Sequence, residues 1–265
     1  MIKKILQIIK EEGSKGIYQR IRIRLYYLIK PKIVKSAYGV YLKSNWGDAT
    51  FNLCFNGTYG YFFSNFLKKV KSNYEFVDIG SNQGIYSLIA AQNSNFKRII
   101  AFEPVFSTYR LFKENIKINK SKNILVKKLA ISNNNGVSKI FFNKNHSGSA
   151  SIKKENAKLF NKVFKIKTIN YKSLNKILNS RKKKIIKIDV EGHELIVLNQ
   201  LIRSNCFKLI DYIYVEVNFN YNKESYIKKK LLKYNFVNIY KTRRINNHCD
   251  FLFKRNIWIN NLYIL

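Results

Sequence analysis

Hydrophobic positions change their period along the chain, and from residue 75 onward short runs rich in Ile, Val and Phe alternate with stretches of helical period. Strands that alternate with helices in this way are typical of βαβ units, which wind a mostly parallel sheet with helices on both faces. The expected strands are Phe76–Ile79, Arg98–Phe102, Ile124–Ile131, Ile185–Val190 and Leu209–Val217. The expected helices lie near residues 85–94, 106–119, 193–204 and 223–234. The pattern therefore predicts an α/β fold.

Two parts of the chain depart from this alternation. Phe236–Tyr240 and Asp250–Phe253 flank a short polar loop, which predicts a closing antiparallel pair of strands. Residues 133–183 form an insertion, with a strand expected at Ser138–Phe142 and a lysine-rich helical part. Within it, Ser147–Ser151 is too small and polar for a core, and we interpret it as a loop near the functional site.

The N-terminal region is strongly basic. Residues 1–35 have Ile and Leu at spacings of three and four, which predicts helix, and their many lysines and arginines face only Glu11 and Glu12. A basic amphipathic helix can lie on an anionic membrane, while a packing helix with a solvated face gives the same pattern. We expect a basic helical extension over residues 1–70 and a catalytic α/β domain over residues 71–265.

Composition adds one unusual feature. With 50 basic and 15 acidic residues among 265, the chain has a formal net charge of +35 and would attract a polyanion such as nucleic acid or an anionic membrane. A compositional bias toward Lys at solvent positions explains the charge equally well. No apolar run approaches the roughly 18 residues that span a bilayer, and the N-terminus lacks the apolar core of a signal peptide. We expect a cytoplasmic protein, with peripheral attachment at the inner membrane face as an option.

A glycine-containing turn, DIGSNQG at residues 78–84, follows the first strand and opens a helix. Glycine lets a ligand approach the backbone closely, and the helix N-terminus after it has free N–H groups. The second glycine comes four residues after the first, unlike the G-x-G-x-x-G dinucleotide fingerprint. Glu103 ends the next strand about 20 residues on, where an acid accepts both ribose hydroxyls of an adenosine ligand. Together they predict a nucleotide-type site.

A second group of candidate residues lies in IKIDVEGHE, residues 186–194, where another strand runs into a helix. Ligands of open α/β sheets bind beyond the carboxyl ends of the strands, so Asp189 and Glu191 are expected to face the crevice, with Glu216 as a third candidate. His193 could take a proton from a hydroxyl near neutral pH, or merely cap and pack its helix. The spacing of the histidines and cysteines predicts no metal site.

These two segments, together with AFEP at 101–104 and AIS at 130–132, resemble the FkbM family of methyltransferases over roughly residues 75–218. The order of D-x-G-x-N-x-G, A-F-E-P and D-V-E-G-x-E is specific, whereas each motif alone is not. The resemblance implies a Rossmann-like class I methyltransferase fold, with a mostly parallel seven-stranded sheet closed by an antiparallel strand. It also implies S-adenosylmethionine as donor and, usually, O-methylation of sugars, polyketides or other secondary metabolites.

The resemblance also assigns residues. It places Asp78, Gly80, Asn82 and Gly84 against the amino acid part of the cofactor, Glu103 at its ribose, and Ser132 and Asn133 near its adenine. Many relatives carry an acid at the position of Asn133. For the chemistry, we expect His193 to act as general base, with Asp189 or Glu191 orienting the histidine or the acceptor.

Three functions remain open from the sequence. The first is an O-methyltransferase acting on a glycan, glycolipid or related hydroxylated metabolite. The second is a nucleic-acid methyltransferase, suggested by the charge, although acids in the turn after the fourth parallel strand would repel phosphate. The third is a non-catalytic polyanion-binding module on the same fold.

Overall fold

The fold is that of a computed structural model, which describes residues 18, 21–143, 145–152, 162–219, 224–242 and 247–256. Its main sheet has seven strands: β3 (Tyr74–Ile79), β4 (Phe96–Phe102), β5 (Ile124–Lys127), β10 (Lys184–Ile188), β11 (Ile210–Asn218), β12 (Phe236–Lys241) and β13 (His248–Arg255). Their order is β12-β13-β11-β10-β3-β4-β5. Only β13 runs antiparallel to its neighbours, which confirms the expected closing pair and the mostly parallel α/β sheet.

The strand order reverses between β3 and β10, at the centre of the sheet. β3 pairs with β4 on one side and β10 on the other, and the chain then builds outward from β10. Ligands of open α/β sheets bind at such a switch point. All five residues of β10 are buried, as are the last five of β3, because helices cover both faces of the sheet here. The fold therefore brings the two segments singled out in the sequence side by side.

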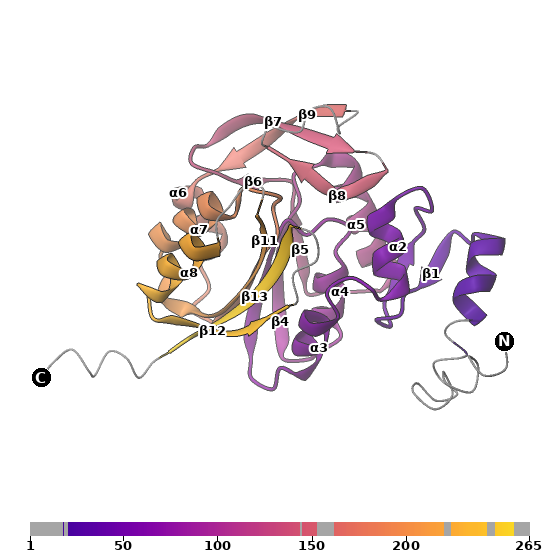
Figure 1. The fold of residues 1–265 in the computed structure, drawn as a ribbon, viewed down its shortest axis with the longest axis horizontal. Helices are drawn as coiled ribbons and strands as arrows, with labels where there is room; N and C mark the ends of the chain where they lie inside the picture. The colour runs from indigo at the N-terminus through magenta and orange to yellow at the C-terminus, as the bar shows by residue number, and fades with distance from the viewer. Residues whose placement is uncertain are drawn as a thin grey trace, which may run out of the picture.

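Helices flank the sheet on both sides. From residue 49 onward, those in the described part of the chain are α2 (Ala49–Asn56), α3 (Tyr61–Lys69), α4 (Ile85–Ala91), α5 (Phe106–Ile118), α6 (Tyr171–Ile177), α7 (Glu194–Arg203) and α8 (Glu224–Leu232). Figure 1 shows α6, α7 and α8 on one side of the sheet and α2, α3 and α4 on the other. Two large buried clusters correspond to these two sides, one around Leu198 and Ile213 and the other around Phe63 and Ile89. Among the described residues, no helix has the length and apolar character that a membrane crossing requires.

The segment before the sheet is not simply helical. Residues 21–29 are helical, but Ile33–Lys35 forms a strand, β1, paired with β2 (Tyr41–Lys43), so the expected helix over residues 1–35 is wrong at its end. Pro31 accounts for the break, since proline cannot continue a helix. Residues 1–17 lie outside the described part. α3 packs directly on the sheet, with the Phe63 ring stacked 4.0 Å from that of Tyr214; the division at residue 70 stays a prediction.

The insertion forms a second sheet, in the order β6-β9-β7-β8. Its strands are β6 (Ala130–Ile131), β7 (Gly136–Asn143), β8 (His146–Ser151) and β9 (Lys162–Ile169). β7 confirms the expected strand. The expected loop at Ser147–Ser151 is wrong, because these residues pair with β7 as part of β8. The expected helical part corresponds to α6 (Tyr171–Ile177), while the lysine-containing run before it forms β9, where burial of Ile166 and Thr168 follows the period of a strand.

Candidate active site

The turn after β3 closes tightly against both neighbouring strands. Gly80 and Ser81 donate backbone hydrogen bonds to Phe102 O, both at 3.0 Å. Gly80 has φ +77°, and a Cβ there would lie 1.7 Å from Asp189 O, so no side chain fits. Gly84 has φ +87° and faces the Phe112 ring at an equally forbidden distance. The glycines of the motif are thus explained by a close approach of three elements, β3, β10 and α5.

The side chains of Asn82 and Gln83, both in this turn, differ in their hydrogen bonding. The Asn82 amide oxygen accepts from Gln83 N at 2.7 Å and lies 3.2 Å from Ser147 Oγ. Gln83 is 1% exposed, yet neither its Nε2 nor its Oε1 has a hydrogen bond with the described residues. A buried amide without a partner is costly, and a bound water, ion or ligand can satisfy it. Gln83 lines the pocket described below.

Glu103 is fixed at the end of β4 by two backbone donors. Its Oε2 accepts from Asn82 N and its Oε1 from Val105 N, both at 2.9 Å. Burial raises the pKa of this carboxyl to about 7, although both N–H groups act to lower it. Each carboxylate oxygen has a second lone pair, so the group can still accept two further hydrogen bonds. The sequence prediction that Glu103 accompanies the glycine turn is confirmed in its geometry.

Lys187 of β10 connects the glycine turn after β3 with the acids that follow β10. Its Nζ lies 3.4 Å from Asp78 Oδ1 and 3.1 Å from Asp189 Oδ2, and it donates to Gly80 O at 2.6 Å. Burial alone would lower the pKa of this amine, but Asp189 and Asp78 outweigh it and raise the pKa. The other oxygen of Asp78 accepts from Ser87 Oγ at 2.7 Å. Asp78 is therefore a structural anchor beneath the turn, held between a lysine and a helix.

Three carboxylates meet near the carboxyl ends of β10 and β11, two just after β10 and one within the last residues of β11. Asp189, Glu191 and Glu216 each offer an oxygen within 4.8 Å of the others. Burial raises the pKa of Glu191 well above its usual value, and Glu216 and Asp189 raise it further. Burial and Asp189 raise the pKa of Glu216 to about 7. We call Asp189, Glu191 and Glu216 the acid trio; because like charges so close disfavour joint ionisation, it holds a proton more readily than separate carboxyls would.

Two aromatic or basic side chains border the acid trio. Tyr59, from the loop between α2 and α3, donates to Asp189 Oδ2 at 2.7 Å and lies 3.4 Å from Glu216 Oε2. His248, the first residue of β13, has its Nδ1 3.0 Å from Glu216 Oε1. The hydrogen bond with Glu216 raises the pKa of His248 to about 9, so the ring carries a positive charge at neutral pH. His248 belongs to β13 (His248–Arg255), whereas the sequence predicts a polar loop up to Asp250.

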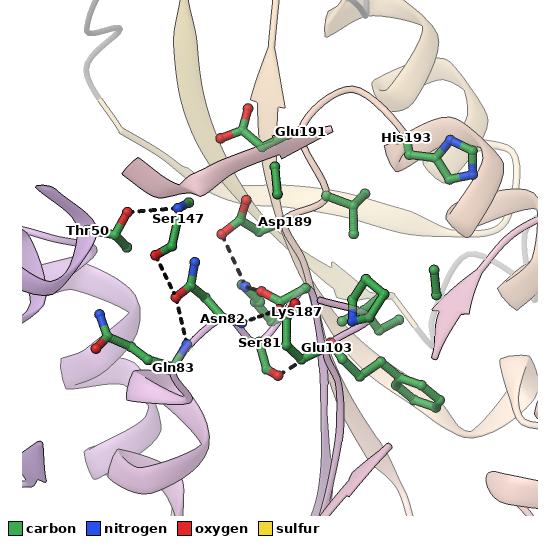
Figure 2. A pocket seen from close by; sticks show the side chains of 18 of the residues that line it. Thr50, Ser81, Asn82, Gln83, Glu103, Ser147, Lys187, Asp189, Glu191 and His193 are labelled. Atoms are coloured by element: carbon green, nitrogen blue, oxygen red, sulfur yellow. Dashed lines mark hydrogen bonds and ion pairs between the residues drawn. The ribbon is translucent and has the colours of Figure 1, made fainter. Parts of the chain in front are cut away.

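Tyr59, Lys187, Asp189 and Glu191 line one pocket at the switch point together with the glycine turn and Glu103, and its volume of about 830 Å³ includes open solvent. Glu216 and His248 do not line it, and they act on it through Asp189 and Glu191. Figure 2 shows side chains of the glycine turn, β8, β10 and the β10–α7 turn converging on it. β8 forms its roof: Ser147 Oγ donates to Asp48 Oδ2 at 2.6 Å, and Gly148 N donates to Thr50 Oγ1 at 2.8 Å. The expectation that Ser147–Ser151 lies near the site is therefore confirmed, even though it is a strand.

The remaining predicted residues lie farther from the acid trio. The His193 ring lines the pocket, but its Nε2 is 3.2 Å from Ser132 Oγ, and in Figure 2 it is directed away from the carboxylates of Asp189 and Glu191. Asn133 is exposed and accepts from Gln200 at 3.1 Å. Neither Ser132 nor Asn133 lines the pocket, whereas the apolar Ile131 does. Their roles stay predictions.

Sequence reasoning missed Tyr59, Lys187 and His248, although it named Glu216 as a candidate. A lysine in the middle of an apolar strand was a usable signal, because a buried amine needs a carboxylate partner. Tyr59 and His248 carried no such signal. Tyr59 lies 130 residues before its partner Asp189 in the sequence, and His248 lies 32 residues after its partner Glu216.

Comparison with known protein families identifies the family of the chain. The methyltransferase FkbM domain matches residues 78–252. The chain belongs to the FkbM methyltransferase family. This match confirms the resemblance carried by the glycine turn and by the acids that follow β10. It establishes a class I methyltransferase of Rossmann-like fold, while leaving the acceptor open. No curated protein matches the chain.

Solved structures resemble the chain only distantly. The complex of aTrm5 and tRNALeu is 15% identical over 84% of this chain, with a TM-score of 0.46, and this chain spans about half, 52%, of its length. M. capricolum TrmK with S-adenosyl-homocysteine is 12% identical over 74% of this chain and 68% of its own, with a TM-score of 0.42. An rRNA methylase from Streptococcus thermophilus is 9% identical over 73% and 93%, also with a TM-score of 0.42.

The tight approach at Gly80 leads to a first prediction. Gly80→Ala combines a left-handed backbone with a clash against Asp189 O, and we expect it to lower the free energy of unfolding by about 2–5 kcal/mol. Gly39→Ala is the matched control, since Gly39 has φ +92° but nothing within 4 Å of the position that the added methyl would take. It should cost only the backbone strain, about 1–2 kcal/mol. Equal losses in urea unfolding would contradict the close approach.

Proposed function

We propose that this chain is an S-adenosylmethionine-dependent O-methyltransferase that acts on a hydroxyl of a glycan, glycolipid or related metabolite. The observation that carries the proposal is the acid trio, two members of which, Asp189 and Glu191, line the pocket. A hydroxyl is neutral near pH 7, so its proton must leave as the new bond to carbon forms, and a carboxylate with a raised pKa is suited to accept it. Clustered carboxylates also accept hydrogen bonds from neighbouring hydroxyls of a polyol.

The lining of the pocket fits the cofactor. S-adenosylmethionine offers a ribose diol, an amino acid end, a flat adenine and a positive sulfonium. Glu103 has acceptor capacity for the diol, and the buried Gln83 amide and the turn at Asn82 suit the polar amino acid end. Phe102 and Ile131 supply an apolar wall for the ring. When bound, the cofactor supplies an electrophilic methyl group.

We place the proton acceptor in the acid trio rather than on His193, and choose Glu191. This residue lines the pocket, and its hydrogen bond with Asn218 Nδ2 is a long one, at 3.4 Å. Asp189 is already engaged by Lys187 and Tyr59, which suits it to orient rather than to accept a proton. Glu216 sits behind, paired with His248. Glu191 is then the general base. The negative charge of Glu216 raises its pKa, and the positive charge of His248 lowers it.

A nucleic-acid acceptor is the alternative that the charge of +35 suggests. The acid trio argues against it, because three carboxylates at the transfer end repel a phosphate backbone. Incubation of the full chain with methyl-labelled S-adenosylmethionine distinguishes a hydroxyl acceptor from a nucleic-acid acceptor. We expect label in neutral glycans or glycolipids, in a product that survives mild alkali as an ether does. Label in a base nitrogen of RNA, found by mass spectrometry of the digest, would overturn the proposal.

Cofactor binding should depend on the charge of Glu103. An ionised Glu103 accepts from both ribose hydroxyls, and its pKa of about 7 means that binding should weaken as pH falls below neutrality. Glu103→Gln should weaken binding by about tenfold to 150-fold at pH 8. It should also abolish the pH dependence, as measured by isothermal titration. Glu114→Gln, a change at an exposed surface acid, is the matched control and should leave affinity unchanged.

The pH profile of turnover should respond to the residues around Glu191. Glu191 must be ionised to accept a proton, so activity should rise with pH through the raised pKa of the trio. Glu216→Gln removes a repelling charge, lowers the pKa of Glu191 and should move this limb to lower pH. His248→Gln removes a stabilising positive charge and should move the limb to higher pH.

His193→Ala separates the two candidate bases. If Glu191 is the base, the variant keeps the limb near its original pH and loses less than about tenfold in turnover, whereas loss of a true general base typically costs about 10²- to 10⁴-fold. Loss of the limb in His193→Ala, with unmoved profiles in Glu216→Gln and His248→Gln, would transfer the role to His193.

A further inference from the structure

The helix at residues 21–29 has two apolar faces, and only one of them is packed. Tyr26 stacks on Phe55 with ring centroids 5.8 Å apart, and Tyr27 packs against Trp46 at 5.4 Å. The opposite side presents Ile21, Leu25, Leu28 and Ile29, at spacings of four, three and one. Leu28 is 80% exposed and Ile29 71%, so this face is uncovered by the described residues. We call these four residues the N-terminal apolar stripe.

The charged residues on this helix and in the segment that follows it up to Lys43 are all basic. Arg24, Lys30, Lys32 and Lys35 are all exposed on or just after the helix. No acidic residue lies between Glu12 and Asp48 in the sequence. In Figure 1 this helix, in indigo, lies at one edge of the molecule beside β1, away from the second sheet that roofs the pocket. A flat surface could therefore contact the stripe while the pocket stays accessible.

We propose that the N-terminal apolar stripe docks on a membrane surface that contains anionic lipid. The combination of exposed large apolar side chains and flanking bases is what an interfacial helix requires, because its apolar face enters the headgroup boundary while its bases meet lipid phosphates. A second copy is a poorer occupant, since each chain carries +35 and the flanks of both stripes are positive. The proposal is independent of the methyl acceptor.

A protein of this charge adsorbs to anionic vesicles by electrostatics alone, so the test must isolate the apolar contribution. The double variant Leu25→Gln, Leu28→Gln leaves the net charge unchanged. Its matched control is Val137→Gln, Leu232→Gln, which replaces two apolar residues of similar exposure, 66% and 60%, elsewhere on the surface. Co-sedimentation of each full chain with vesicles of phosphatidylcholine plus about 30% phosphatidylserine gives the partition coefficients.

We expect the stripe variant to lose about tenfold or more in partitioning, and the control variant to match the unmodified chain. The residual binding of the stripe variant should disappear in high salt, because electrostatic adsorption is screened. As a second readout, Leu28→Trp should shift its fluorescence emission to shorter wavelength when vesicles are added, which adsorption without insertion does not cause.

Three results would overturn the proposal. The first is equal partitioning of the stripe and control variants, and the second is an unshifted emission of Leu28→Trp on vesicles that bind it. The third is a concentration-dependent dimer in sedimentation velocity that the stripe variant abolishes, since this would assign the stripe to a second copy. Thermal melting of both double variants checks that the fold is intact, and the exposure of the substituted side chains predicts unchanged midpoints.

Discussion

The site depends on one buried charge, the ammonium of Lys187. It sits between β3 and β10, where it neutralises Asp78 and Asp189 and also holds Gly80 O. Without this amine, the buried Asp78 and the largely buried Asp189 would lose the cation they share, and removing one member of a buried ionic group is strongly destabilising. Lys187 thereby fixes the glycine turn and the start of the acid trio in one arrangement. The crevice at the switch point is thus held by electrostatics as much as by packing.

The acid trio gives this strongly basic protein a local field of opposite sign. Asp189, Glu191 and Glu216 gather in a chain with only 15 acidic residues, and His248 and Lys187 partly compensate them. Such a field favours an acceptor that donates hydrogen bonds over one that carries phosphate at the reacting group. The positive charge of the remaining surface acts over longer range, through attraction to polyanions.

Segments remote in sequence complete the pocket. Tyr59 comes from the loop between α2 and α3, and the roof strand β8 is tied to the start of α2 by Asp48 and Thr50. Asn115 of α5 links β2 to the glycine turn, because it accepts from Lys43 N at 2.7 Å and donates to Gln83 O at 2.9 Å. The chain before the sheet therefore contributes directly to the walls of the site.

The sequence by itself determined the strand-turn-helix units, the glycine turn, Glu103 and the acids after β10. These features are local: a buried strand is a continuous apolar run, and a left-handed turn favours glycine. The family resemblance rested on the same local segments. The errors fell at the end of the N-terminal helix, where Ile33–Lys35 pairs with β2, and in the insertion, where small polar residues such as Ser147 form a strand because β7 pairs with them. Both are long-range effects that composition does not report.

Only the tertiary structure decided which groups meet. Nothing in the residues around Tyr59 or His248 indicates a functional position. The tertiary fold brings both next to Glu216, from which they are separated by 157 and 32 residues in the sequence. The same holds for the orientation of His193 toward Ser132, which the sequence left open. The physical reason is that a pKa or a hydrogen bond depends on distance in space, while a sequence motif records only distance along the chain.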